Sequence, residues 1–267
     1  MTTLVLTYHS CNISGNDYSC NDHIALEQDL KTIYAQGFQV ISLADAVAAG
    51  LSGRSGSFVA LTFDDGPIFD FEDFIHPQYG HQKSFTRILQ EFNTQTDATA
   101  TASSFVIASP IGRKQMDQKD YGERDWWHDR WWKPAIESGQ LTIENHSWDH
   151  NHRAIDPSAH KYNQRGGFED INTEAECELE IRKSSEYIRS VTARTPKFFA
   201  YPWGQSSDYL RSIYLPKIGP EIGLDAAFSI VPKAITPDCN RWFLPRFVCG
   251  DNWQSANGLK SILETSA

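Results

Sequence analysis

Eight short segments rich in β-branched and aromatic residues recur along the 267-residue chain, and helix-like stretches separate most of them. The segments cover residues 4–8, 38–43, 58–63, 104–108, 141–144, 197–201, 226–231 and 242–248. Strands that alternate with helices predict parallel strands joined by crossover helices. We therefore expect an α/β fold, namely a distorted (β/α) barrel of seven or eight mostly parallel strands that forms a single domain over residues 1–267.

Two of the helical stretches carry clear end signals. Residues 23–36 stop at Gly37, as a helix with a glycine after its last turn does. Residues 173–194 open with Thr173 and Glu176, a spacing typical of a capping box. In contrast, residues 110–124 and 151–170 are polar and lack periodicity, which predicts long loops at the rim of the barrel.

The composition argues against several classes of partner. The formal net charge of −10 disfavours nucleic acid, because no basic patch would attract phosphates. No run of 18 apolar residues occurs, so no integral membrane segment is expected, and nothing in the sequence indicates a protein partner. The five cysteines contain no CxxC pair, so neither a disulfide framework nor a thiolate zinc site is indicated.

The first residues lack the basic and apolar regions of a signal peptide. This predicts a cytoplasmic protein, although a removed signal peptide or a trimmed sequence would look the same.

Two adjacent carboxylates, Asp64 and Asp65, directly follow the apolar segment 57–63. Consecutive strand residues face opposite ways, so both can serve one centre only if the backbone bends. Gly66 and Pro67 supply such a bend. An acidic turn without further role is the alternative interpretation.

Two histidines, His146 and His150, follow another strand-like segment. Residues four apart share one face of a helical turn, and imidazoles so placed commonly hold Zn²⁺, which takes three protein ligands in catalytic sites. One of the two aspartates would complete that set. Two surface histidines in a polar loop are the alternative, which the acidic motif disfavours. A non-haem iron oxygenase site is also disfavoured, because Trp148 stands where its HxD pairing needs an acid.

The polar clusters follow the first, third, fifth and sixth predicted strands. In a (β/α) barrel, active sites lie at the C-terminal ends of the strands, so these clusters are expected at one rim. Four tryptophans near residue 130 are expected mainly to pack in the core, although one or two of them could stack on sugar rings. They are Trp126, Trp127, Trp131 and Trp132.

Three motifs together carry a family resemblance. Residues 62–66 read TFDDG, residues 146–150 read HSWDH, and residues 200–204 read AYPWG. In order and spacing, the chain resembles the polysaccharide deacetylases of carbohydrate esterase family four, the NodB-type domain. Residues 197–204 look most similar to the branch that acts on poly-N-acetylglucosamine.

This resemblance implies a metal-dependent hydrolase that removes N-acetyl groups from a poly- or oligosaccharide of N-acetylhexosamine. It assigns one divalent ion, zinc by preference, to Asp65, His146 and His150, and it assigns the role of general base to Asp64. The backbone N–H of Trp203 would stabilise the oxyanion, and Ser147 would support a ligand. Substrate contacts are expected from Tyr201, Pro202, Trp203 and Trp148.

Two departures from the family pattern matter. Ala200 replaces the arginine of the third motif, and no histidine follows His160 to serve as general acid. His9 is our candidate acid, because Tyr8 and His9 resemble a motif of circularly permuted relatives; a structural histidine at the end of the barrel is the alternative.

Arg246 is our candidate to replace the missing arginine. The alternative is that Arg246 forms an ordinary surface ion pair. His152 is expected to be a solvated loop residue. Competing functions are an O-acetyl xylan esterase, a cyclic-ureide amidohydrolase and a non-catalytic saccharide-binding relative.

Overall fold

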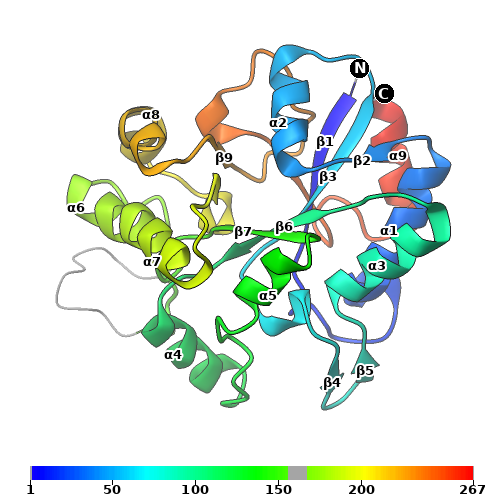
Figure 1. Cartoon of the computed structure of the whole chain (residues 1–267), viewed down its shortest axis with the longest axis horizontal. Coiled ribbons are helices and arrows are strands. Elements are labelled where there is room, and N and C mark those ends of the chain that lie inside the picture. The colour runs from blue at the N-terminus through cyan, green and yellow to red at the C-terminus, as the bar shows by residue number, and fades with distance from the viewer. Residues whose placement is uncertain (1, 156–166, 267) are drawn as a thin grey trace.

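The computed structural model describes residues 2–155 and 167–266. Its centre is a curled parallel sheet in the order β10-β1-β3-β6-β7-β8-β9, with β2 also paired to β3 (Figure 1). The sheet strands are β1 (Thr2–Tyr8), β2 (Gln39–Val40), β3 (Ser57–Phe63), β6 (Ala102–Val106), β7 (Leu141–Asn145), β8 (Phe198–Ala200), β9 (Ala226–Phe228) and β10 (Phe247–Val248). The expected mostly parallel (β/α) barrel is confirmed.

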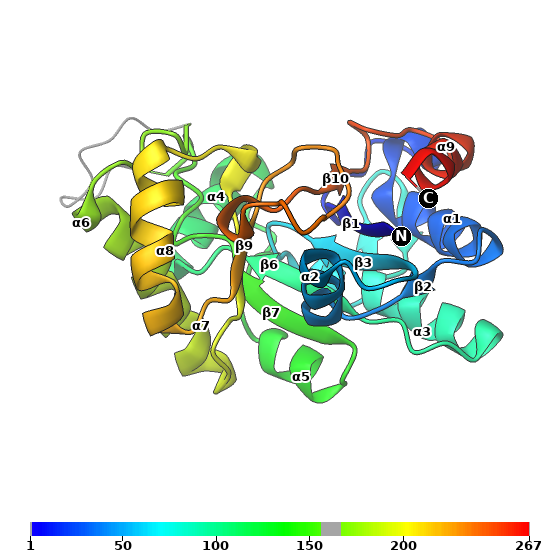
Figure 2. The same ribbon diagram turned by 90° about the horizontal axis from the view of Figure 1, so that it is seen from above.

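Helices flank the sheet at both of its ends (Figures 1 and 2). At one end α1 (Asp22–Ala35) contacts both α3 (Phe85–Thr96) and α9 (Ala256–Ser266). At the other end lie α6 (Glu174–Cys177), α7 (Lys183–Thr192) and α8 (Leu215–Ile218). The remaining α-helices are α2 (Leu43–Ser52), α4 (Pro110–Asp120) and α5 (Trp132–Glu137). None of the helices in the described ranges has the length and hydropathy that crossing a bilayer requires.

The segment before β10 brings the two edges of the sheet together. Leu244 forms a parallel bridge with Phe228 of β9, while Phe247 pairs with Leu6 of β1. One short stretch of chain therefore touches both edge strands. This contact closes the barrel and places the end of β10 beside the ends of β1 and β3.

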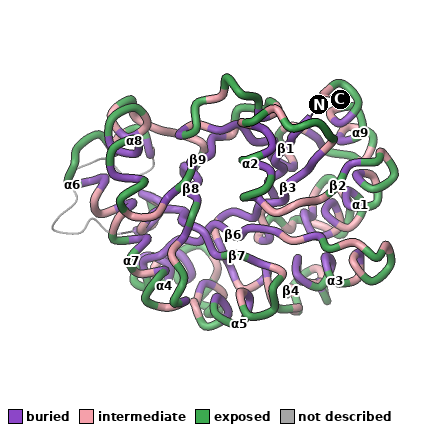
Figure 3. The backbone as a smooth tube through the Cα atoms, turned by 45° about the horizontal axis from the view of Figure 1, so that its top comes forward, coloured by how far each residue is buried: buried purple, intermediate pink, exposed green. Residues whose placement is uncertain are grey.

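The sheet strands are largely buried, as the purple stretches of Figure 3 show, and their side chains alternate between two layers. In β1, Leu4 and Leu6 belong to the large cluster that packs on α1, α3 and α9. Val5 faces the other way, into a cluster that contains Ala60 and Phe228 together with residues of α2. This second cluster fills the barrel interior beneath the rim, so the site above it rests on a packed floor.

Several local predictions were wrong. Residues 110–124 were expected to form a loop, but Pro110–Asp120 form α4, whose N-cap is the Ser109 side chain. The helix was missed because its buried positions include polar residues such as Arg113 and Asp117, which leave no apolar stripe to detect. Of the second expected loop, residues 156–166 lie outside the described residues.

Four predicted strands are shorter than expected. Those at 197–201 and 226–231 shrink to Phe198–Ala200 and Ala226–Phe228, and the other two shrink to two residues each. Within 38–43 only Gln39–Val40 form a strand, and α2 begins at Leu43 behind a Ser42 N-cap. Within 242–248 only Phe247–Val248 do, and a 3₁₀ turn covers Arg241–Phe243. An antiparallel hairpin of β4 (Phe74–His76) and β5 (Gly80–Gln82) was not anticipated.

The predicted helix 173–194 is present but is divided into segments. The capping box of Thr173 and Glu176 is confirmed, and a π-helical stretch, Glu178–Arg182, separates α6 from α7. A second π-helical stretch, Leu210–Tyr214, precedes α8. Other 3₁₀ turns cover Tyr18–Cys20, Ile68–Asp70, Pro202–Gly204 and Pro220–Ile222.

Candidate functional site

The chain bends sharply where β3 ends, as its sequence predicted. Asp64 faces the barrel interior, as Ala60 and Thr62 do, because side chains two residues apart along a strand lie on the same face. Asp65 and Gly66 then take positive φ values of 75° and 72°. A side chain at Gly66 would lie 2.6 Å from the Val106 side chain, so glycine is required at this position. The bend lets both carboxylates reach the barrel mouth.

The two histidines come from an irregular loop after β7, which corrects the expected helical turn. Ser147 and His150 have positive φ values of 74° and 60°, which no helix contains. The loop is held by hydrogen bonds instead. Asn145 Oδ1 accepts from the Ser147 N–H at 2.7 Å, and Ser147 Oγ accepts from the His150 N–H at 2.8 Å. Ser147 thus fixes the loop that carries both imidazoles.

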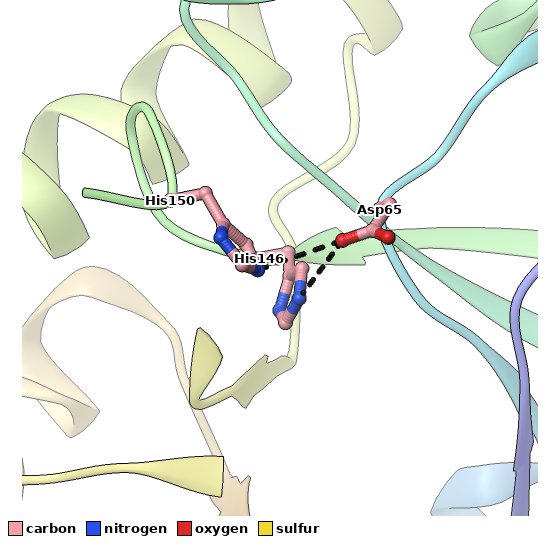
Figure 4. Close-up of side chains that lie close together, drawn as sticks. All are labelled: Asp65, His146 and His150. Atoms are coloured by element: carbon pink, nitrogen blue, oxygen red, sulfur yellow. Dashed lines mark ion pairs between the residues drawn. The ribbon is translucent and has the colours of Figure 1, made fainter. Parts of the chain in front are cut away.

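Asp65, His146 and His150 converge as the sequence predicted (Figure 4). Asp65 Oδ1 lies 3.6 Å from His146 Nε2 and 3.5 Å from His150 Nε2, and the three ligand atoms lie within 4.8 Å of one another. Around one tetrahedral ion with bonds of about 2.0–2.1 Å, neighbouring ligand atoms stand roughly 3.4 Å apart. The observed separations fit that spacing, so the three residues form a group that could hold one metal ion.

The hydrogen bonding of His146 and the ionisation of His150 and Asp65 also suit a metal. His146 Nδ1 lies 2.9 Å from the Ala200 carbonyl and donates to it, which leaves the Nε2 lone pair free for a ligand bond. Burial and, to a smaller extent, the neighbouring His146 lower the pKa of His150 to about 3. Burial alone would raise the pKa of Asp65, but the two histidines outweigh it and lower that pKa. The result is a carboxylate facing neutral imidazole, the ionisation state of metal ligands.

Arg246 holds Asp64 through two parallel hydrogen bonds. Its two terminal nitrogens, Nη1 and Nη2, donate to Asp64 Oδ1 and Oδ2 at 2.8 Å each. The arginine is completely buried, and its Nε donates to the Ser229 carbonyl at 3.1 Å. Burial would raise the pKa of Asp64, but the guanidinium charge outweighs it and lowers that pKa. This pair is a buried one, so the alternative of an ordinary surface ion pair is wrong.

A cavity of about 340 Å³ joins the metal group to the ion pair. Its lining residues are His9, Asp64, Asp65, His146, His150, Trp203, Gly204, Ile230, Val248 and Asp251. The backbone N–H of His9 donates to the Asp22 carboxylate at 2.8 Å. The buried ring nitrogen Nδ1 of His9 has no hydrogen-bond partner among the described residues.

Trp203 forms part of the wall of this cavity. It has a φ of 53° and a side chain that is 37% exposed, and its ring meets that of His150 edge-on at a centroid distance of 4.3 Å. The left-handed backbone at a bulky residue is unusual and aims the ring at the metal group.

Three of the predicted substrate contacts lie elsewhere. Tyr201 is completely buried and its hydroxyl donates to the Trp242 carbonyl at 2.6 Å, so it cannot meet a ligand in the cavity. Pro202 is buried outside the lining. Trp148 packs edge-on against Tyr187, with the Lys183 Nζ 4.0 Å from its ring centre. These three residues support the loops rather than line the site.

Most of the tryptophans near residue 130 pack in the core. Trp127, Trp131 and Trp132 are buried in the core, as expected, while Trp126 is half-buried. His152 lies outside the metal group, as expected, and its Nδ1 is 3.9 Å from Asp120 Oδ2.

Three residues near the site escaped the sequence analysis. Cys11 Sγ donates to Asp65 Oδ2 at 3.9 Å, Asp22 accepts from His9, and Asp251 lines the cavity. Cys11 stands two residues after the candidate acid, and this proximity was the available signal. Asp22 and Asp251 lie on other segments, so nothing local in the sequence linked them to the site.

Comparison with known sequences agrees with this geometry. A poly-β-1,6-N-acetyl-D-glucosamine N-deacetylase from Staphylococcus aureus (strain MSSA476) is 26% identical over 152 residues, which are 57% of this chain and 46% of that protein. The homologue from strain MRSA252 is 25% identical over 151 residues. The match thus spans about half the length of these curated relatives.

Solved structures share the fold over nearly the whole chain. IcaB from Ammonifex degensii superposes with a TM-score of 0.63 at 19% identity, covering 97% of both chains. The deacetylase PplD from Streptococcus pyogenes superposes with a TM-score of 0.65 at 17% identity, covering 98% of both. The polysaccharide deacetylase family profile matches residues 52–215, which include the TFDDG, HSWDH and AYPWG motifs and more than half of the sequence. The chain therefore belongs to the polysaccharide deacetylase family.

Proposed function

We propose that this chain is a metal-dependent deacetylase that hydrolyses N-acetyl groups of a saccharide built from N-acetylglucosamine. One observation carries the proposal: a two-histidine, one-carboxylate group lines the same cavity as Asp64, which the buried Arg246 holds in place. The first is the ligand set of a catalytic zinc with an open position. The second is a carboxylate held in place beside it, as a general base must be.

Nitrogen and oxygen donors of this kind suit zinc among the common divalent ions. When bound, the ion acidifies a water molecule and polarises the acetyl carbonyl. Asp64 takes the proton of the attacking water, and Arg246 keeps the carboxylate oriented and ionised. Both oxygens of Asp64 are already occupied by the guanidinium, so the proton transfer uses the remaining lone pairs.

His9 lies on the same cavity wall and supplies the proton that the leaving amine needs. The N–H of Trp203 would donate to the oxyanion as charge develops on the carbonyl oxygen. No saccharide contact is assigned to Tyr201, Pro202 or Trp148.

The substrate class follows from the relatives. The curated matches are named for poly-β-1,6-N-acetyl-D-glucosamine, so a β-1,6-linked N-acetylglucosamine oligomer is the first substrate to test. Esters of xylan and cyclic ureides remain competing substrates, and product analysis separates them. An amide gives a free amine and acetate, an ester gives a free hydroxyl group and acetate, and a ureide gives an opened ring.

The decisive experiment combines metal analysis with acetate release. We expect one divalent ion per chain and acetate release that a chelator abolishes and zinc restores. Asp65→Asn should lose the metal, whereas Asp64→Asn should keep it and lose turnover by about 10²-fold or more. A metal-free protein with full activity would exclude the proposal. A protein that binds the saccharide but releases no product would instead support the non-catalytic alternative.

A further inference from the structure

A strip of polar side chains is buried between the helical segment 174–192 and the loop 146–150, which we call the metal loop. Glu180 and Ser184 are completely buried, and Ser185 is 3% exposed. A glutamate is almost never buried this far unless it has partners, because removing its charge from water is costly. Packing alone would place apolar side chains here, so the strip indicates a specific task.

The metal loop is irregular, so its N–H groups need acceptors that a regular helix would otherwise supply. The groups at its two ends are satisfied nearby. The His146 N–H donates to the Val106 carbonyl at 3.0 Å. The Ser147 and His150 N–H groups donate to Asn145 Oδ1 and Ser147 Oγ, as described above.

The two N–H groups in the middle of the metal loop donate to Glu180. Those of Trp148 and Asp149 share one carboxylate oxygen, Oε2, at 3.2 Å and 3.4 Å. A carboxylate oxygen can accept two such bonds at once. One buried side chain thus fixes the part of the loop that lies between His146 and His150.

The same helical segment also holds the residue that precedes the metal loop. Asn145 Nδ2 donates to the Ile181 carbonyl at 3.0 Å and to Ser185 Oγ at 2.8 Å. Asn145 Oδ1 accepts from Ser184 Oγ at 2.7 Å. Because Asn145 is bonded to His146 along the chain, the helical segment holds the loop both at its start and in its middle.

These contacts coincide with the π-helical stretch Glu178–Arg182. The Lys183 N–H donates to the Glu178 carbonyl, five residues earlier, as π-helical bonding requires. Such turns are rare and occur frequently at functional sites. Here the Glu180 carboxylate and the Ile181 carbonyl, which hold the metal loop and Asn145, both come from this single turn.

We propose that Glu180 is a positioning residue of the metal group: it holds the metal loop in the conformation in which His146 and His150 both face Asp65. The proposal rests on the proposed metal-dependent function and adds to it a residue that does not line the cavity. A loop that is already ordered binds an ion without the entropic cost of ordering it. Loss of Glu180 should therefore weaken metal binding itself.

The test measures the zinc dissociation constant of the full chain by competition with a chelator. Glu180→Ala should raise it by about tenfold or more, because groups that orient metal ligands commonly contribute 10- to 100-fold to affinity. Glu180→Gln should recover most of the affinity, since its amide oxygen can still accept from the loop. Ser184→Ala is a milder variant in case Glu180→Ala fails to fold, and it should raise the constant by about fivefold through loss of one neutral hydrogen bond.

Glu178→Ala is the matched control from the same π-helical stretch. The Glu178 carboxylate accepts from Arg182 Nε and, at 2.7 Å, from the Tyr214 hydroxyl, instead of from the metal loop. Its removal should lower the unfolding free energy of the metal-free protein but change the zinc dissociation constant by less than about twofold.

The outcomes separate this inference from the proposed function. If the wild type binds no divalent ion, the proposed function fails. If the wild type binds zinc, but Glu180→Ala and Ser184→Ala bind it as tightly as Glu178→Ala does, only the positioning role is overturned. The same conclusion follows if Glu180→Gln binds as weakly as Glu180→Ala, because the hydrogen bonds to the loop would then not be the cause.

Discussion

Arg246 and Asp64 are 182 positions apart in the sequence, yet each terminal guanidinium nitrogen of one lies 2.8 Å from a carboxylate oxygen of the other. Both side chains are buried. The pair exists because the segment before β10 closes the barrel and brings its last strand beside β1. Ala200 stands where the sequence analysis expected an arginine, and the charge beside Asp64 comes instead from the segment that precedes β10.

Replacing Arg246 with methionine should damage both stability and turnover. Asp64 would remain buried without its cation, and breaking a buried pair in this way costs about 3–5 kcal/mol. Urea unfolding measures the stability change, and acetate release measures the activity. Arg246→Lys should recover only part of either, because an ammonium cannot make the two parallel bonds.

The matched control for this change is Arg241→Ala. Arg241 is exposed, and among residues 2–155 and 167–266 its side chain donates only to the Asp225 carbonyl. Its removal should therefore change the unfolding free energy by no more than about 0.5 kcal/mol. A similar small effect for Arg246→Met would contradict the structural role of the pair.

His9→Asn should lower kcat by about 10²-fold while metal content stays at the wild-type level, because general acid catalysis typically contributes that much. Metal analysis and single-turnover acetate release on the same preparation provide the measurement. His152→Asn is the control, since His152 lies outside the lining of the cavity. Full activity of the His9→Asn variant would show that another group is the general acid.

Trp203→Ala should raise KM by about tenfold and leave kcat less affected, because it removes the exposed ring but keeps the backbone N–H. Trp203→Tyr should retain most of the affinity. Trp148→Phe should leave KM unchanged, since Trp148 packs against Tyr187 outside the cavity. Steady-state kinetics on one oligomer measures KM and kcat for the three variants. If only Trp148→Phe raised KM, Trp148 rather than Trp203 would be the substrate contact.

Asp29 should make stability depend on pH. Burial raises its pKa to about 6, although Tyr8, Tyr18 and Trp253 all donate hydrogen bonds to it. The Asp29 carboxyl binds its proton more tightly in the folded protein than in the unfolded chain. Its stabilising contribution to the free energy of unfolding is therefore complete below the unfolded pKa of 3.8. It is lost as the pH rises through about 6.

Asp29→Asn lacks this titration. The difference in unfolding free energy between wild type and variant should therefore shrink by up to about 3 kcal/mol between about pH 4 and about pH 8. Urea unfolding at both pH values measures it, and parallel pH profiles for the two proteins would show that Asp29 does not titrate in this range.

The metal group was predictable because its signals are local. A β-rich segment ending in Asp64 and Asp65, followed by a glycine that must adopt positive φ, specifies a strand and its bend within ten residues. His146 and His150 likewise follow directly from β7. Parallel strands send their C-terminal ends to one rim, so the pattern of the strands was enough to predict that these groups meet.

The sequence alone thus determined the parallel barrel, the three candidate ligands and the residue most suited to act as a base. Tertiary structure decided the rest. It paired Arg246 with Asp64, removed Tyr201 and Trp148 from the cavity, and turned residues 110–120 into a helix whose buried face is polar. The physical reason is that burial and pairing depend on which segments of the folded chain meet, and a polar side chain that is buried by a distant partner leaves no mark in its local sequence.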